Sequence, residues 1–175
     1  TKGYVYNAMA SLRIGSNFNV SGMYNGFLQS QGTGTVVVND TTEVKRALHS
    51  FSLLPTYNLS GETLDHTFSM SGNYTTNKDL NKFSIGQNDV KTLALGASYN
   101  MDVKPWETNF TLSLSHQSSK GFNTEYSSDV ASLSTGRSFL KDKNLNASAT
   151  VSLCYNEVKH QSKNLSIGLD INAGY

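Results

Sequence analysis

Residues 163–175 read K-N-L-S-I-G-L-D-I-N-A-G-Y, and this stretch decides the fold. One side of an extended chain would carry Leu165, Ile167, Leu169, Ile171, Ala173 and Tyr175. The other side would carry Asn164, Ser166, Gly168, Asp170, Asn172 and Gly174. Alternation with a period of two residues predicts a β-strand with one apolar and one polar face. Its length matches the roughly 9 to 11 tilted residues with which a barrel strand crosses a bilayer.

The same alternation recurs along the whole chain. It predicts eight further strands, at residues 4–14, 18–28, 44–57, 65–75, 90–101, 107–117, 126–139 and 145–155. The strand at 126–139 is the least regular, because Thr135 and Arg137 share the parity of its apolar residues. This irregularity predicts a β-bulge or an arginine at the membrane interface.

The composition excludes several classes of protein. Charged residues make up 15% of the 175 residues and the net charge is +1, so we expect no nucleic-acid partner. No stretch approaches eighteen apolar residues, which excludes a transmembrane helix. The single cysteine, Cys154, forms no internal disulfide, and the four histidines have no metal-ligand spacing. We therefore expect no metal and no cofactor.

Three regularities predict an all-β, antiparallel, up-and-down transmembrane β-barrel in the bacterial outer membrane. Short connections at 15–17, 58–64, 102–106 and 140–144 alternate with longer ones at 29–43, 76–89, 118–125 and 156–162. Charges avoid the centres of the strands, where lipid would make them costly. Aromatic residues gather at the strand ends and are expected at the membrane interfaces, among them Tyr4, Tyr24, Tyr74, Trp106, Tyr155 and Tyr175. A soluble β-sandwich that acts as a binding module is the alternative fold.

The predicted number of strands has a consequence for the extent of the domain. Nine is odd, whereas bacterial single-chain barrels have an even number of strands. An unclosed sheet would also leave edge N–H and C=O groups unpaired in lipid. We therefore expect residues 1–175 to be a single β-barrel segment of a larger barrel, incomplete at the N-terminus, with at least one strand before Thr1.

Two stretches resemble outer-membrane barrels of Bacteroidota in style. They are residues 18–24 (F-N-V-S-G-M-Y) and residues 136–148 (G-R-S-F-L-K-D-K-N-L-N-A-S), the second combining a strand end, a lysine-rich turn and an Asn/Ser-alternating strand. The resemblance covers most of the chain but includes no diagnostic motif. It implies a barrel fold and an outer-membrane location, in a class that includes nutrient transporters and parts of secretion or assembly machines.

A short motif offers a catalytic alternative. His116 and Ser118 resemble the His-x-Ser of outer-membrane phospholipase A, in which the two residues act at the lipid face of the barrel. Here Ser119 and Lys120 intervene before the next glycine, and no residue matches the asparagine that orients the histidine in that family. Spacing alone does not make such a site. We expect an interfacial histidine and no enzymatic activity, with a lipid-modifying enzyme as the alternative.

The polar face predicts the role of the interior. Its small uncharged residues include Asn164, Ser166 and Asn172, and Asp170 is the one carboxylate in the middle of a regular strand. These four are the residues we expect in the lumen. No ring of charges is visible, which favours a plugged, occupied or neutral interior over a charge-selective pore. The expected function is a transport channel or a subunit of an outer-membrane secretion or assembly complex. Its expected partners are outer-membrane lipid and other outer-membrane or periplasmic subunits or lipoproteins.

Overall fold

The computed structural model describes residues 2–32, 43–81, 87–139 and 145–174. These residues form nine strands and one short 3-10 helix. In chain order they are β1 (Lys2–Ile14), β2 (Phe18–Gly32), β3 (Glu43–Ser60), β4 (Leu64–Asp79), β5 (Val90–Val103), η1 (Lys104–Trp106), β6 (Thr108–Lys120), β7 (Glu125–Phe139), β8 (Leu145–Val158) and β9 (Ser162–Gly174).

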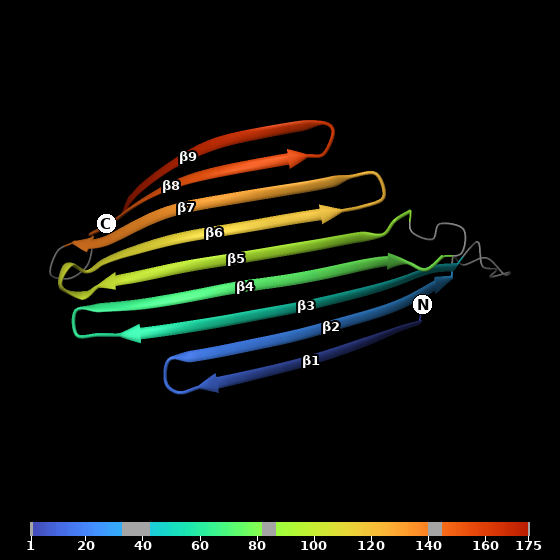
Figure 1. The fold of residues 1–175 in the computed structure, drawn as a ribbon, viewed down its shortest axis with the longest axis horizontal. Coiled ribbons are helices and arrows are strands. Elements are labelled where there is room, and N and C mark those ends of the chain that lie inside the picture. The colour runs from blue at the N-terminus through green and yellow to red at the C-terminus, as the bar shows by residue number, and fades with distance from the viewer. Residues whose placement is uncertain (1, 33–42, 82–86, 140–144, 175) are drawn as a thin grey trace.

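All nine strands belong to one sheet, in the order β1 to β9 (Figure 1). Each strand is antiparallel to its neighbours in the sequence. The prediction of nine antiparallel, up-and-down strands is therefore confirmed. The sheet is not closed, since β1 and β9 are its two edges within the described residues.

The predicted strands agree with the observed ones to within a few residues, but several connections are shorter than expected. Two of them were expected to be long and are short. Pairing continues to Lys120↔Glu125 in one hairpin and to Val158↔Ser162 in another, so the connections are residues 121–124 and 159–161. The expected long loops at 118–125 and 156–162 were wrong. Residues 33–42, in the first long connection, lie outside the described part of the chain.

Of the two explanations for the irregular strand at 126–139, the bulge is wrong, and an arginine at a membrane interface stays a prediction. Pairing of β7 with both β6 and β8 runs without an inserted residue. Thr135 sits between Phe110 and Ala149, and Arg137 sits between Thr108 and Ala147, in regular register. The Arg137 guanidinium lies over the ring of Phe139, 5.0 Å from its centroid. This cation–π contact gives the arginine a favourable partner on the apolar side.

Pro55 is accommodated inside β3. Its pairing with Val20 of β2 is retained, whereas the ladder to β4 skips Leu54 and Pro55 and resumes at Thr56. Proline has no N–H to donate to a ladder, so one side of the strand must lose hydrogen bonds at this position.

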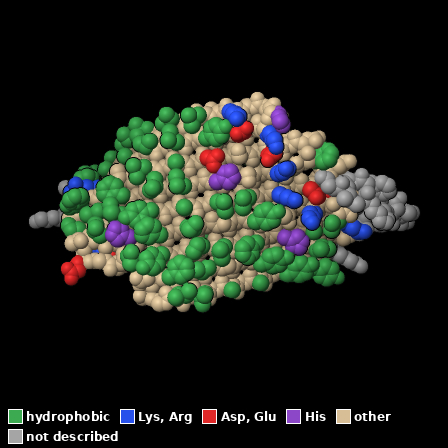
Figure 2. All heavy atoms as spheres, in the orientation of Figure 1, with side chains coloured by type: hydrophobic (Ala, Val, Ile, Leu, Met, Phe, Trp, Pro, Cys, Tyr) green, Lys and Arg blue, Asp and Glu red, His purple; other side chains and the backbone are tan. Residues whose placement is uncertain are grey.

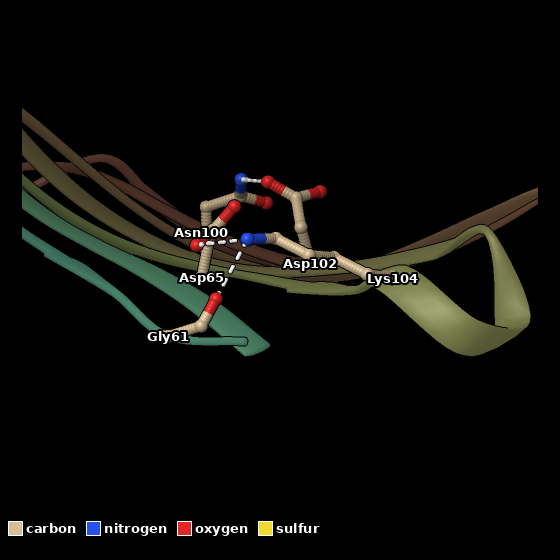
Figure 3. A network of polar contacts seen from close by, with 5 residues as sticks. All are labelled: Gly61, Asp65, Asn100, Asp102 and Lys104. Atoms are coloured by element: carbon tan, nitrogen blue, oxygen red, sulfur yellow. Dashed lines mark hydrogen bonds and ion pairs between the residues drawn. The ribbon is translucent and has the colours of Figure 1, made fainter. Parts of the chain in front are cut away.

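Polar contacts join two neighbouring turns at one end of the sheet (Figure 3). Lys104 of η1 donates a hydrogen bond from Nζ to the Gly61 carbonyl oxygen at 2.7 Å and forms an ion pair with Asp65 at 3.0 Å. Asn100 donates to the carboxylate of Asp102 at 3.2 Å. The connection after β3 is thus tied to the connection after β5.

Candidate functional site

The pairing register places the apolar sides of all nine strands on the same face of the sheet. One row of directly opposed residues crosses the whole sheet without a polar interruption. It consists of Ile14, Phe18, Tyr57, Phe68, Tyr99, Leu112, Leu133, Val151 and Leu169. We call this side the apolar face. Strand alternation alone predicted each segment of it, and the register joins the segments into one surface.

The apolar face is uncovered by the described residues. The exposed fractions of the large residues on β9 are 66% for Leu165, 73% for Ile167, 69% for Leu169 and 71% for Ile171. Figure 2 shows hydrophobic side chains spread across a broad face of the sheet. Contiguous apolar surfaces of this extent mark a contact with a membrane or another protein.

The apolar face extends along most of the length of β8. On β8 its apolar residues run from Leu145 to Tyr155, and Glu157 follows on the same side. Ten residue steps cover about 34 Å at about 3.4 Å per residue. A strand tilted by about 45° would then span about 24 Å, close to the roughly 25 Å apolar band of outer-membrane barrels.

The predicted interface aromatics lie mostly on this face. Tyr4 opposes Leu28, Tyr74 opposes Phe51, and Tyr155 donates a hydrogen bond to Glu157 at 3.1 Å. Tyr24 belongs to the same face, and Trp106 is 62% exposed in η1. Tyr175 lies outside the described residues.

Each of three histidines on the apolar face has a side-chain partner. The Tyr24 hydroxyl shares a hydrogen bond with His49 Nδ1 at 2.7 Å, and the Tyr99 hydroxyl shares one with His66 Nδ1 at 2.8 Å. His116 donates from Nδ1 to Asp129 Oδ1 at 2.7 Å. Such pairing reduces the cost of placing a polar ring on an apolar surface.

The structure brings only part of the catalytic candidate together. His116 and Asp129 help to line a shallow apolar hollow of about 490 Å³ with Leu95, Leu114 and Leu153. Ser118 shares their face, opposite Leu93 and Ser127, but among the described residues it makes no hydrogen bond with His116. Sequence reasoning missed Asp129. The short turn at 121–124 is the feature that would have indicated it, because this turn sets the register that places Asp129 opposite His116.

The opposite side, which we call the polar face, carries hydrogen-bonded amides and hydroxyls. Asn73 donates to Ser52 at 2.7 Å and accepts from Thr75 at 3.0 Å. Further along, Asn109 donates to Asp102 at 2.8 Å, and Thr111 donates to Asn100 at 2.8 Å. These contacts link side chains across neighbouring strands, so much of this surface is held in place by its own residues.

The four predicted lumen residues all lie on the polar face of β9. Asn164 opposes Asn156, Ser166 opposes Cys154, Asp170 opposes Thr150 and Asn172 opposes Ser148. Asp170 accepts a hydrogen bond from the Asn172 amide. Within the described residues no cation pairs with Asp170. Arg13, on the polar face of β1, lies at the other edge of the sheet. Lys45 falls on the side of the apolar face, opposite Ser30.

The described ranges contain no group of three or more His, Cys, Asp or Glu side chains placed to hold a metal ion. None of their helices is long and apolar enough to cross a membrane. No protein-family model matches the chain, and no curated protein or solved structure matches it either.

Proposed function

We propose that this chain forms part of the wall of an outer-membrane β-barrel, with its apolar face toward lipid and its polar face toward the interior. The observation that carries the proposal is the uninterrupted apolar row from Ile14 to Leu169, which crosses nine strands and is left uncovered by the described residues. In water, apolar surface costs about 25 cal/mol per Å², so a face of this extent requires a cover. Hydrocarbon provides one along the full width of the sheet.

The edges of the sheet bear on how such a barrel would close. In a bilayer the edge groups of β1 and β9 need hydrogen-bond partners. Both strands run in the same direction, from the end of the sheet at which β4 ends to the end that bears η1 (Figure 1). Antiparallel closure therefore requires an odd number of further strands between the two edges.

The polar face favours a non-enzymatic role. Its middle is built mostly from Ser, Thr, Asn and Gly residues, with Met9, Met23 and Leu54 among them and Asp170 as the central carboxylate of β9. A neutral, hydrogen-bonded wall suits a neutral transport path, or an interior occupied by a plug or a partner, better than a charge-selective pore. The proposed function is thus a transport channel or a subunit of an outer-membrane secretion or assembly complex.

The proposal is tested first by insertion of the protein into vesicles and then by measurement of its conductance in planar bilayers. The protein, purified in detergent and folded into phosphatidylcholine vesicles, should migrate differently on a gel before and after boiling. It should also resist extraction by carbonate. Stepwise conductance in planar bilayers then supports a channel, whereas recovery of fixed stoichiometric partners from the outer membrane supports a complex. A protein that stays soluble without detergent and never associates with vesicles would overturn the proposal.

One observation favours a second candidate, a hydrolase that acts on lipid. Asp129 holds His116 at 2.7 Å in the manner in which an acid orients a catalytic histidine, and Ser118 lies on the same face. The Ser118 hydroxyl would have to turn toward His116 to complete a nucleophilic site. Phospholipid hydrolysis that is lost in both Ser118→Ala and His116→Ala would establish this activity, and no hydrolysis by the folded wild type would dismiss it.

A further inference from the structure

Lysines border the apolar face at one end of the sheet. Lys91 of β5 and Lys120 of β6 are directly opposed, and Lys78 lies on the same face of β4, two residues beyond Thr76, which pairs with Lys91. Figure 2 shows lysine and arginine side chains gathered toward this end of the surface. Like charges placed directly opposite each other destabilise a pair of strands. This arrangement therefore favours an anion between them.

The neighbouring carboxylates are already engaged. Glu125, opposite Lys120, forms an ion pair with Lys159 at 2.7 Å. Glu157 forms an ion pair with Lys163 at 3.3 Å. Asp89 accepts a hydrogen bond on Oδ1 from the backbone N–H of Asp79 at 2.8 Å.

Lys159 and Lys163 are held in ion pairs, and the three lysines at the border of the apolar face differ from them. Within the described residues, Lys78, Lys91 and Lys120 form no ion pair. Lys120 is attracted by the opposed Glu125, but no carboxylate of the described residues holds any of the three lysines at ion-pair distance, so each can reach an anion from outside the chain.

The surface between two of these lysines is hollowed. A depression of about 200 Å³ is lined by Asp89, Lys91, Lys120, Gly121 and Phe122. Phe122 is 67% exposed beside it. Leu93 and Leu95 continue along the same face of β5 toward the middle of the sheet. A ligand in this hollow would thus meet cations at one end and an apolar surface at the other.

We propose that Lys91 and Lys120, assisted by Lys78, bind the phosphate of an anionic membrane lipid whose acyl chains lie along the apolar face. Lysine binds phosphate as a compact positive charge, and basic clusters beside a membrane-spanning surface recognise anionic lipid headgroups. The amphipathic chemistry of the site matches such a lipid at both ends. This inference rests on the proposed membrane location of the apolar face.

The test uses the protein folded into phosphatidylcholine vesicles that also contain phosphatidylglycerol. Native mass spectrometry after extraction counts the phosphatidylglycerol molecules retained per protein. The wild type should retain phosphatidylglycerol in preference to phosphatidylcholine. The double variant Lys91→Gln, Lys120→Gln should lose this preference about tenfold or more, because each lysine near the surface contributes to the attraction of an anionic lipid.

A matched double variant controls for net charge. Lys104→Gln with Arg137→Gln removes the same two positive charges at the opposite end of the sheet and should retain phosphatidylglycerol as the wild type does. Equal retention by the wild type and the Lys91/Lys120 variant overturns the inference, and so does an equal loss in the control. Displacement of the lipid by excess inorganic phosphate also overturns it, since the site would then take any phosphate.

The same samples separate this inference from the proposed function. Gel migration before and after boiling reports whether each protein is folded in the vesicles. A folded, inserted wild type without lipid preference rejects the lysine site alone. A wild type that does not enter vesicles rejects the membrane location and the lysine site together.

Discussion

His116 and Asp129 face each other across the β6–β7 hairpin on the apolar face of the sheet. Nδ1 of the imidazole lies 2.7 Å from Oδ1 of the carboxylate. Leu95 flanks the histidine on one side of the pair and Tyr155 flanks the aspartate on the other. Two ionisable groups thus occupy a surface that we assign to lipid, and each is the other's polar partner.

This pairing predicts a strong coupling between the two positions. His116→Leu or Asp129→Leu alone should lower the free energy of unfolding by about 1 to 3 kcal/mol, because each leaves an unpaired polar group on the apolar face. The double variant should be close to the wild type or more stable. Urea titration in vesicles of the wild type, the two single variants and the double variant completes a double-mutant cycle. Additive effects of the single substitutions would show that the pair is not coupled.

The assignment of the faces predicts opposite tolerances to arginine on β9. Leu169→Arg should cost about 2 to 4 kcal/mol of membrane stability, because it places a charge in hydrocarbon near mid-depth. Ser166→Arg is the matched variant on the polar face and should cost far less. The fraction of protein that migrates as the folded form after refolding into vesicles reports both. Similar losses in the two variants would mean that the faces are wrongly assigned.

Close packing at Gly26 predicts a steric penalty. A Cβ at Gly26 would lie 2.5 Å from Cδ2 of Tyr6, so Gly26→Ala should destabilise the sheet by about 1 kcal/mol or more. At Gly22 the nearest atom would be 3.8 Å away, so Gly22→Ala should be neutral or slightly stabilising. Urea midpoints compare the two variants. Adding Tyr6→Ala to Gly26→Ala should remove the steric part of the loss, and a persistent loss would point to another cause.

An ion pair between Lys159, in the turn between β8 and β9, and Glu125 predicts a loss of stability at high pH. The hydrogen-bonded ion pair with Glu125 raises the pKa of Lys159 above its ordinary value of 10.5. A raised lysine pKa contributes stability that is present below about pH 10.5 and is lost as the pH rises through the folded-state pKa. The difference in urea midpoint between the wild type and Lys159→Gln should therefore shrink above pH 10.5. A difference that is independent of pH would show that the ion pair contributes nothing.

Much of the fold could be predicted because alternation reports directly which residues share a side of a strand. The run from Leu165 to Ala173 has no competing pattern, and β9 is found where the sequence places it. Alternation carries less information near the ends of strands. Ser118 and Ser119 have no apolar signal of their own, yet their pairing with Leu93 and Thr92 keeps them in β6.

Contacts between strands could not be predicted from alternation, because it does not specify partners. The pairing of His116 with Asp129 and the opposition of Lys91 and Lys120 both depend on the register that two short connections impose. One of the two explanations for the irregularity at Thr135 and Arg137, the bulge, is wrong for a related reason. A threonine fits a regular position when Phe110 and Ala149 lie beside it.

The order of the strands has a consequence for assembly. Within the described residues, every strand hydrogen-bonds only to the strands that precede and follow it in the sequence. Such a ribbon can grow by adding successive hairpins, with no need to open an existing pair and insert a distant segment. Excising one complete hairpin would narrow the sheet by two strands and leave the orientation of all the others unchanged. The architecture is therefore suited to changes of sheet width by loss or duplication of hairpin units.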